Sequence, residues 1–119
     1  MAPITPLSSE VVRMVTLALD AASMRQQVIA ANIANAGDPA YQRRGVSFEE
    51  RLRELAANST LPGASMAALQ PRLVKDNSTA ALDQDLAALA GNALHYQALL
   101  KTVNAELELL GLAASDGRR

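Results

Sequence analysis

Apolar residues in the first third of the chain repeat with the spacing of one long helix. They recur alternately three and four positions apart, the heptad signature of a helix that packs lengthwise against another. The row comprises Val12, Val15, Leu19, Ala22, Gln26, Ile29, Ile33 and Ala36, with the glutamine as its one polar member. Gly37 and Pro39 follow in the order that commonly ends helices. This pattern predicts a helix over residues 8–36.

A second, longer row occupies the last third of the chain. Its four–three alternation is unbroken for more than four heptads, which favours a coiled-coil seam over an ordinary amphipathic helix. The row comprises Leu82, Leu86, Leu89, Ala93, Tyr96, Leu100, Val103, Leu107, Leu110 and Ala114. It predicts a helix over residues 79–114, with Ser78 or Thr79 as the N-cap. Other leucines lie off this row and widen the apolar face, which indicates more than one packing partner. They are Leu94, Leu99, Leu109 and Leu112.

The middle of the chain, residues 37–77, has a different pattern. Ser47 followed by Glu50 has the spacing of a capping box and predicts a short helix over about residues 47–57. The apolar side of this helix consists of Phe48, Leu52 and Leu55. The stretch at 64–75 is weakly patterned, so an extended segment, a hairpin and a mobile loop all stay open. Its larger apolar members are Met66, Leu69, Leu73 and Val74.

The composition favours helices throughout. Alanine supplies 24 and leucine 18 of the 119 residues, against one Phe, two Tyr and no Trp. Ala and Leu are strong helix formers, whereas strands prefer β-branched and aromatic residues. We therefore expect one all-α domain over residues 1–119, with two long helices in an antiparallel, coiled-coil-like hairpin joined by an irregular middle. Because so many apolar residues are alanines, we expect thin helix–helix contacts rather than a thick core.

Few residues could support catalysis or bind a cofactor. The chain has one histidine, His95, and no cysteine, whereas a zinc site needs three or four protein ligands. Asp76, Asp83 and Asp85 lack the alternating oxygen ligands and central glycine of a calcium loop. We interpret them as capping and helix-dipole residues. The sequence therefore predicts no enzyme activity, no metal and no cofactor.

Charge and hydropathy exclude several partner classes. The net charge is −1, which gives no basic surplus for a nucleic acid. The first residues show no basic start and no apolar run before a cleavage site, so we expect no cleaved signal peptide. No stretch approaches 18 continuous apolar residues, so we expect no membrane insertion.

Basic and acidic side chains alternate in the middle segment. The residues are Arg43, Arg44, Arg51 and Arg53, with Glu49, Glu50 and Glu54. They form either a solvated, charge-balanced helix face or a polar contact with a neighbouring subunit. Arg13 and Arg25 of the first helix leave the same alternatives.

The end of the first helix carries a more specific motif. Residues 31–44 read ANIANAGDPAYQRR, which resembles the N-terminal motif of the flagellar rod, hook and axial protein family: Asn-Ile-Ala-Asn, two residues, then Thr-Pro-Gly-Tyr. The matching residues are Asn32, Ile33, Ala34, Asn35, Pro39 and Tyr41. Asp38 and Ala40 stand where the family usually has Thr and Gly. Because Pro-Gly suits a type II turn, Ala40 favours a type I turn instead.

The last third of the chain shows a second similarity. Residues 89–99 read LAGNALHYQAL and resemble the family's Leu-Ala-Glu-Asn-Ala-Leu-Arg-Tyr-Gln-Ala-Leu, with Asn92 and Tyr96 in place. Residues 76–83 keep four positions of the family's Asp-Gly-Asn-Thr-Val-Asp-Leu-Asp. Within the family, these stretches are similar to proximal rod proteins of the B type.

The resemblance implies a structural subunit of the proximal rod of the bacterial flagellar basal body, a torque-transmitting shaft that crosses the periplasm. It also implies self-association, contacts with other rod subunits and with the adaptor between export gate and rod base, and type III export without a cleaved signal peptide. Two other classes stay open. One is another axial rod protein, of the C-type proximal or the distal rod; the other is a helical adaptor or chaperone unrelated to flagella.

Asn32 and Asn35 allow two interpretations. Asparagine suits a helix end, where its amide can meet free carbonyl groups, so the pair can be a C-terminal cap. In the resembling family, the same residues belong to an assembly motif where the helix meets an inter-subunit loop. Both interpretations can hold. Since the residues are three apart, we expect them on one helix face, beside the seam.

Overall fold

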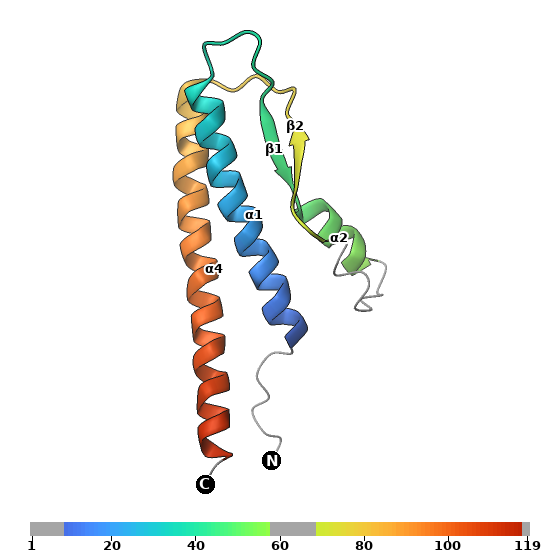
Figure 1. Ribbon diagram of the computed structural model, residues 1–119, viewed down its shortest axis with the longest axis vertical. Coiled ribbons are helices and arrows are strands. Elements are labelled where there is room, and N and C mark those ends of the chain that lie inside the picture. Colours follow the sequence, from blue (N-terminus) through green and yellow to red (C-terminus); the bar gives the residue numbers. More distant parts are fainter. Residues whose placement is uncertain (1–8, 58–68, 118–119) are drawn as a thin grey trace.

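Two long helices dominate the computed structural model, which describes residues 9–57 and 69–117. Helix α1 (Ser9–Ala34) and helix α4 (Leu82–Asp116) run antiparallel along each other (Figure 1). At 1.5 Å per residue, their lengths are about 39 and 52 Å. The molecule measures 63 × 29 × 17 Å, so it is an elongated hairpin rather than a globule. The expected helical hairpin is confirmed.

Between the long helices the chain forms a small arm, which we define as β1 (Arg44–Ser47), α2 (Glu49–Ala57) and β2 (Arg72–Lys75). The two strands pair antiparallel, with Arg44 opposite Lys75 and Ser47 opposite Arg72. Helix α2 confirms the expected short helix, but it begins at Glu49, and Ser47, the expected capping residue, is the last residue of β1 instead. Of the open alternatives for the stretch at 64–75, strand β2 shows an extended segment over Arg72–Lys75. Met66 lies outside the described residues. Strand β1 was not expected, because its four residues include a single β-branched side chain.

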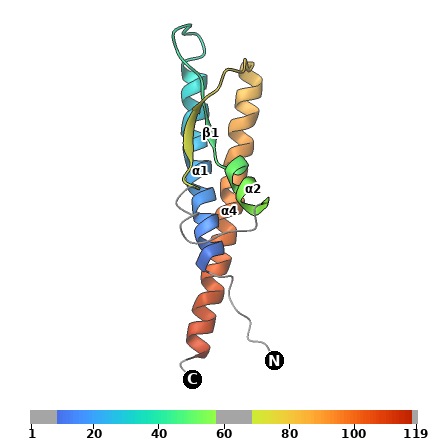
Figure 2. The same cartoon turned by 90° about the vertical axis from the view of Figure 1, so that its right-hand side faces the viewer.

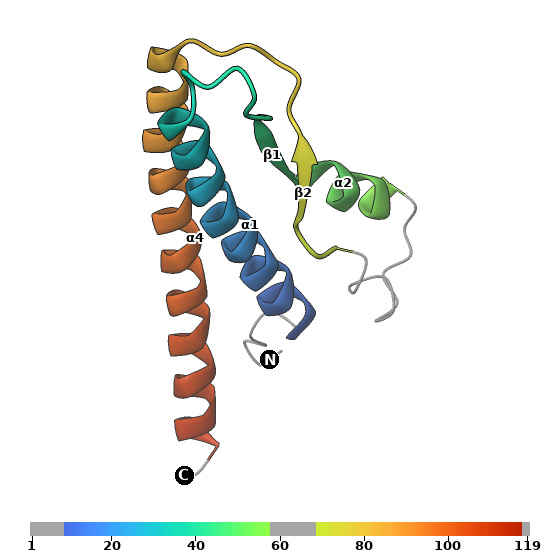
Figure 3. The same ribbon diagram turned by 45° about the horizontal axis from the view of Figure 1, so that its top comes forward.

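Helix α1 lies between α4 and the arm. Helix α4 runs along one side of α1, and the sheet with α2 lies on the opposite side (Figures 1 and 3). Viewed from the arm, the sheet and α2 lie in front of the long helices (Figure 2). Helix α1 therefore has two separate interfaces.

The apolar core lies between α1 and the arm. Leu17 and Ala21, one turn apart on α1, are buried together with Phe48 and Leu69. Leu69 has no exposed surface, and Phe48 keeps 2%. Partly buried apolar side chains complete the cluster: Met14, Ala18, Val46, Leu52 and Leu55.

The contact between α1 and α4 is thinner and partly polar. Ala22 of α1 is fully buried. The buried residues of α4, a helix described in full, are Asp85, Asn92 and Glu106. The row expected on α1 is mostly half-buried. Its half-buried members include Val12, Val15, Leu19, Ile29 and Ile33.

Only part of the row expected on α4 lines the inside of this hairpin, which corrects the sequence prediction. Several of its members are 37–57% exposed: Leu82, Leu86, Tyr96, Leu100, Leu107 and Leu110. Leu89, Ala93 and Val103 are partly buried. The reason is a rotation of the helix by about one residue. Asp85, Asn92 and Glu106, at multiples of seven, occupy the inward positions that the expected row gave to apolar residues.

The helix ends also differ from the prediction. Helix α1 ends at Ala34 rather than at residue 36. Helix α4 begins at Leu82, with Ala81 rather than Ser78 or Thr79 as the N-cap. The N–H and hydroxyl of Ser78 instead donate to Asp76 Oδ1, at 2.9 and 2.5 Å, so Ser78 belongs to the turn before the helix.

Candidate assembly site

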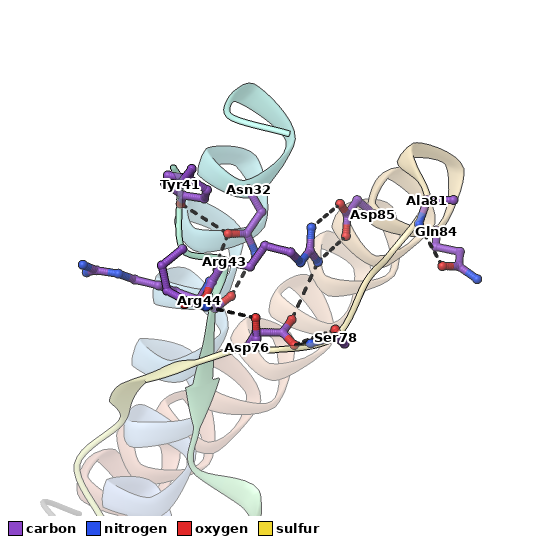
Figure 4. Close-up of polar contacts among 10 residues, drawn as sticks. Asn32, Tyr41, Arg43, Arg44, Asp76, Ser78, Ala81, Gln84 and Asp85 are labelled. Carbon is purple, nitrogen blue, oxygen red and sulfur yellow. Dashed lines mark hydrogen bonds and ion pairs between the residues drawn. The ribbon is translucent and has the colours of Figure 1, made fainter. Parts of the chain in front are cut away.

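Asn32 joins the end of α1 to the first strand of the arm. Its Nδ2 donates to the carbonyl oxygen of Arg44 at 2.9 Å, and its Oδ1 accepts from the Arg44 N–H at 3.2 Å. The hydroxyl of Tyr41 donates to the same Oδ1 at 3.3 Å (Figure 4). The side-chain amide thus takes the place of a neighbouring strand along β1. Asn32 is 3% exposed, so its amide lies within the chain and not on a surface open to a neighbour.

Asn35 has a different, local role. Just beyond the end of α1, its Nδ2 donates to the carbonyl oxygen of Ala31 in the last turn of the helix, at 2.8 Å. Asn35 therefore fits the capping interpretation, whereas Asn32 is neither a cap nor an exposed contact. Between the two, Ile33 is half-buried and Ala34 is exposed.

The turn after α1 is held by Asp38. The N–H of Tyr41 donates to the carbonyl oxygen of Asp38 at 3.1 Å, and the N–H of Ala40 donates to Asp38 Oδ1 at 2.9 Å. Asp at the first position and Pro39 at the second are type I preferences. The Asp in place of the family's Thr thus supports a turn that does not contain the family's Gly.

Arg43 ties the arm to the start of α4. Its guanidinium donates two hydrogen bonds to Asp85, at 2.9 and 3.0 Å, and lies 3.7 Å from Asp76 Oδ2 (Figure 4). The carbonyl oxygen of Arg43 also accepts from the Asp76 N–H at 2.9 Å. The expected dipole role of Asp85 is therefore incomplete, because this carboxylate is buried as the partner of an arginine.

These contacts shift the ionisation of the groups involved. The hydrogen bonds from Arg43 hold the pKa of Asp85 below its usual value, and the same bonds raise the pKa of Arg43. The hydrogen bonds from Ser78 lower the pKa of Asp76, with a smaller contribution from Arg43. All three groups are therefore charged at neutral pH.

Arg25 forms a second link, between α1 and the arm. It donates to both carboxylate oxygens of Glu49, at 2.9 and 2.8 Å, and to the carbonyl oxygen of Val46 at 3.2 Å. Burial raises the pKa of Glu49, but the hydrogen bonds, that from Arg25 first, outweigh it, so the pKa is lowered overall. Arg51 donates to the carbonyl oxygens of Ser47 and Gln70. The alternating charges are thus partly internal links, while Arg44 and Arg53 are exposed.

Asn92 links the two long helices. Its Nδ2 donates to the carbonyl oxygen of Ala22 and to Gln26 Oε1, both at 2.8 Å. One turn further along, Tyr96 borders a shallow hollow of about 260 Å³ between α1 and α4. Of the two motif residues on α4, Asn92 is therefore internal and Tyr96 is partly accessible.

The arginine links were not found from the sequence. The Arg43–Asp85 pair joins residues 42 apart, and the Arg25–Glu49 pair joins residues 24 apart. No short-range pattern in the sequence indicates such pairings, although basic and acidic residues do alternate in the middle segment. Across residues 9–57 and 69–117, no group of three or more His, Cys, Asp or Glu side chains is placed to hold a metal ion.

No protein-family profile matches the chain. Individual proteins do match. The chain is 31% identical over 114 aligned positions to the flagellar basal body rod protein FlgB of Escherichia coli strain K12, covering 76% of this chain and 83% of that protein. The chain belongs to this flagellar rod protein family. Its identity to the FlgB proteins of Salmonella typhimurium and Bacillus subtilis is 28% in each case, over 76% and 85% of this chain and 83% and 90% of those proteins.

Family membership confirms the resemblance carried by the two motifs. The protein is a structural subunit of the flagellar basal body rod and associates with other rod components. In the described part of the chain, no helix has the length and apolar character needed to cross a membrane.

Proposed function

We propose that this rod subunit belongs to the proximal segment of the rod, and that its role is mechanical rather than catalytic. Hairpins of this kind would stack side by side into a torque-transmitting shaft. The observation that carries the proposal is the burial pattern of α4: its buried residues are polar, while many of its leucines are exposed. Contiguous exposed apolar patches typically mark interaction sites, and several leucines of α4 are exposed.

The exposed leucines suit lateral packing. Leu86, Leu100 and Leu107 are spaced at multiples of seven on one side of α4 and are 40–52% exposed. Fully burying a leucine contributes roughly 1.5–3 kcal/mol, so covering several exposed halves would supply several kcal/mol per contact. Head-to-tail contacts between copies that do not close into a ring produce a helical array, which is the geometry that a shaft requires.

The neighbours in this proposal are copies of this chain, other rod subunits and the adaptor between the export gate and the rod base, with no nucleic acid. The proposal also includes a periplasmic position and type III export without a cleaved signal peptide. These points rest on the family relationship and on the motif around Asn32 and Tyr96.

The contact between Asn32 and Arg44 would contribute to assembly indirectly. The amide of Asn32 is enclosed, so it would act by fixing the direction of the arm relative to α1. Pro39 and Ala34 are exposed beside it, and Tyr41 is half-buried. A rigid arm presents the same surface on every subunit, which a regular array needs.

A pair of substitutions on the exposed row tests the assembly role. We expect Leu86→Gln with Leu107→Gln to leave the helicity and the free energy of unfolding of the monomer nearly unchanged, because surface substitutions usually stay within about 0.5 kcal/mol. Basal bodies from the variant strain should lack a complete rod, and the cells should not swim. Asn104→Gln, at an exposed polar position of the same helix, is the matched control and should swim normally. Normal rods in the double variant would contradict the proposal.

A further inference from the structure

The register of the arm's sheet determines which residues of each strand direct their backbone groups toward the other strand and which direct them outward. In an antiparallel pair, alternate residues exchange backbone bonds with the partner strand, and the residues between them point their N–H and C=O groups away from it. The N–H of Asp76 donates to the carbonyl oxygen of Arg43, just beyond the ladder. With Arg44 opposite Lys75, the backbone groups of Arg44 and Lys75 therefore point away from the sheet, on opposite edges.

The β1 edge is occupied. Asn32 satisfies both the N–H and the C=O of Arg44. Two residues on, the carbonyl oxygen of Val46 accepts from Arg25. Side chains of α1 therefore take the place of a third strand on this side.

The β2 edge is open. By the same alternation, the backbone groups that point outward on β2 are the N–H and C=O of Leu73 and Lys75. Within residues 9–57 and 69–117 no side chain or loop backbone is hydrogen-bonded to these groups. All four residues of β2 are exposed, with Leu73 at 48% and Val74 at 43%. Figure 1 shows no described helix or strand alongside β2 on the side away from β1, and α2 lies below the lower end of the strand.

We propose that this open edge binds an extended, acidic segment of another protein, which adds to the sheet as a third, antiparallel strand. Strand addition takes its affinity from main-chain hydrogen bonds and its specificity from alternate side chains. Here the edge reads basic, apolar, apolar, basic from Arg72 to Lys75, and exposed Arg44 lies opposite Lys75. A partner with two glutamates flanking two apolar residues complements this order.

A second copy of this chain is a poorer occupant of the same edge. Each copy would bring the exposed cations Arg44, Arg72 and Lys75 into one sheet, and crowding of like charges across strands is destabilising. The nearest acidic side chain, Asp76, is already engaged by Arg43 and Ser78. The charges thus select an acidic strand of different sequence. Alternatively, cations on a short edge strand protect it from any pairing, and the experiment separates these two roles.

The test uses the full-length chain and a short blocked peptide, Thr-Glu-Val-Ile-Glu-Thr, with residue-resolved amide exchange measured by NMR. We expect the peptide to slow exchange at Leu73 and Lys75 by about tenfold or more, because their amides become donors to the new strand. The amides of Arg72 and Val74 already face β1 and should change little. A peptide N-methylated at the two pairing residues keeps the charge and should give no protection.

Charge reversal on the protein provides the second arm of the test. Arg72→Glu with Lys75→Glu should weaken binding of the acidic peptide by about tenfold or more and create binding of the peptide with Lys in place of Glu. Circular dichroism checks that the variant keeps its helices. Equal binding of the N-methylated peptide would mean charge attraction without strand addition and would overturn the proposal. So would the absence of protection at about 1 mM peptide, or protection that appears with protein concentration alone, the sign of a second copy.

Discussion

Helix α1 has two unlike faces. Toward the arm, Leu17 and Ala21 pack against Phe48 in an apolar cluster like the interior of a globular domain. Toward α4, the buried groups include Asn92, whose amide bonds to the backbone of Ala22, and the contact contains little large apolar surface. One face of the same helix is complete in the single chain, and the other depends on hydrogen bonds and small side chains.

The two faces of α1 differ in what they contribute: one gives stability, and the other fixes the alignment of the helices. Apolar burial stabilises the arm on α1. A buried asparagine in a helix pair contributes little net stability but fixes the alignment of the two helices, and Asn92 has this position between α1 and α4. The Arg43–Asp85 pair fixes the other contact of α4, near its first turn. Helix α4 is therefore well aligned but weakly packed, while its leucines remain available to neighbours.

The largest effect on the free chain is expected in the arm's core. Phe48→Ala removes a buried ring and should lower the free energy of unfolding by about 3–5 kcal/mol. Urea unfolding followed by circular dichroism measures it. Leu94→Ala on α4, where the side chain is 68% exposed, is the control and should change stability little. Similar losses for both variants would contradict the contrast between the two faces.

The two asparagines of the motif should differ next. Asn32→Ala leaves the N–H and C=O of Arg44 without their partner, at a cost of roughly 1–3 kcal/mol. Asn35→Ala removes one local bond to Ala31 and should cost about 1 kcal/mol or less. Equal costs in urea unfolding would show that Asn32 does not support the arm.

The double variant of the same pair separates folding from assembly. If Asn32→Ala with Asn35→Ala keeps monomer helicity while basal bodies lose the rod, the motif acts in assembly. Helicity and rod recovery that fall in proportion would instead assign the motif to folding alone.

Much of the fold was predictable from the sequence, for local reasons. Heptad spacing, alanine content and the Gly37–Pro39 stop are signals that lie within a helix or directly beside it, so the sequence predicts both long helices and the short α2. The inward face of α4 was not predictable in the same way. Two heptad rows that lie one residue apart on a helix share every other member. The row with Leu100 is apolar throughout, whereas the row with Asn92 contains polar residues, so the sequence pattern favours the row with Leu100 as the inward face.

The candidate site was partly predictable as well. The motif identified Asn32 and Tyr41 by resemblance, but not Arg44, whose backbone bonds to the Asn32 amide, because β1 has almost no strand signal. Likewise, the sequence pattern indicates only a helix-dipole role for Asp85, because its arginine partner lies far away in sequence. Long-range ion pairs decide such roles, and a single sequence does not encode them in spacing.

Acid should loosen the contacts of Arg43 with Asp85 and Asp76 before it affects the apolar core. The pKa values of Asp85 and Asp76 are lowered in the folded chain, so the unfolded chain binds protons first as the pH falls. Their contribution to stability is therefore complete above the unfolded pKa, near pH 4, and is lost as the pH falls through the lower folded values. Amide exchange around β1 and the start of α4, measured from pH 6 to 3, should show this loss. Asp85→Asn should flatten the dependence; a slope unchanged in that variant would contradict the role of the pair.

The smallest effect on the free chain is expected at Leu100, and it distinguishes the two rows of α4. Leu100 and Val103 belonged to the same expected seam, but Leu100 is 40% exposed, whereas Val103 is half-buried across from Val12. Val103→Asp places a charge against apolar side chains and should cost roughly 1–3 kcal/mol. Leu100→Asp should stay within about 0.5 kcal/mol in the monomer and still abolish swimming, because the charge then faces a neighbouring subunit. Urea unfolding and motility on soft agar measure the two effects separately. A loss of monomer stability at Leu100 equal to that at Val103 would place this leucine inside the hairpin, and normal swimming of Leu100→Asp would remove the exposed row from the assembly.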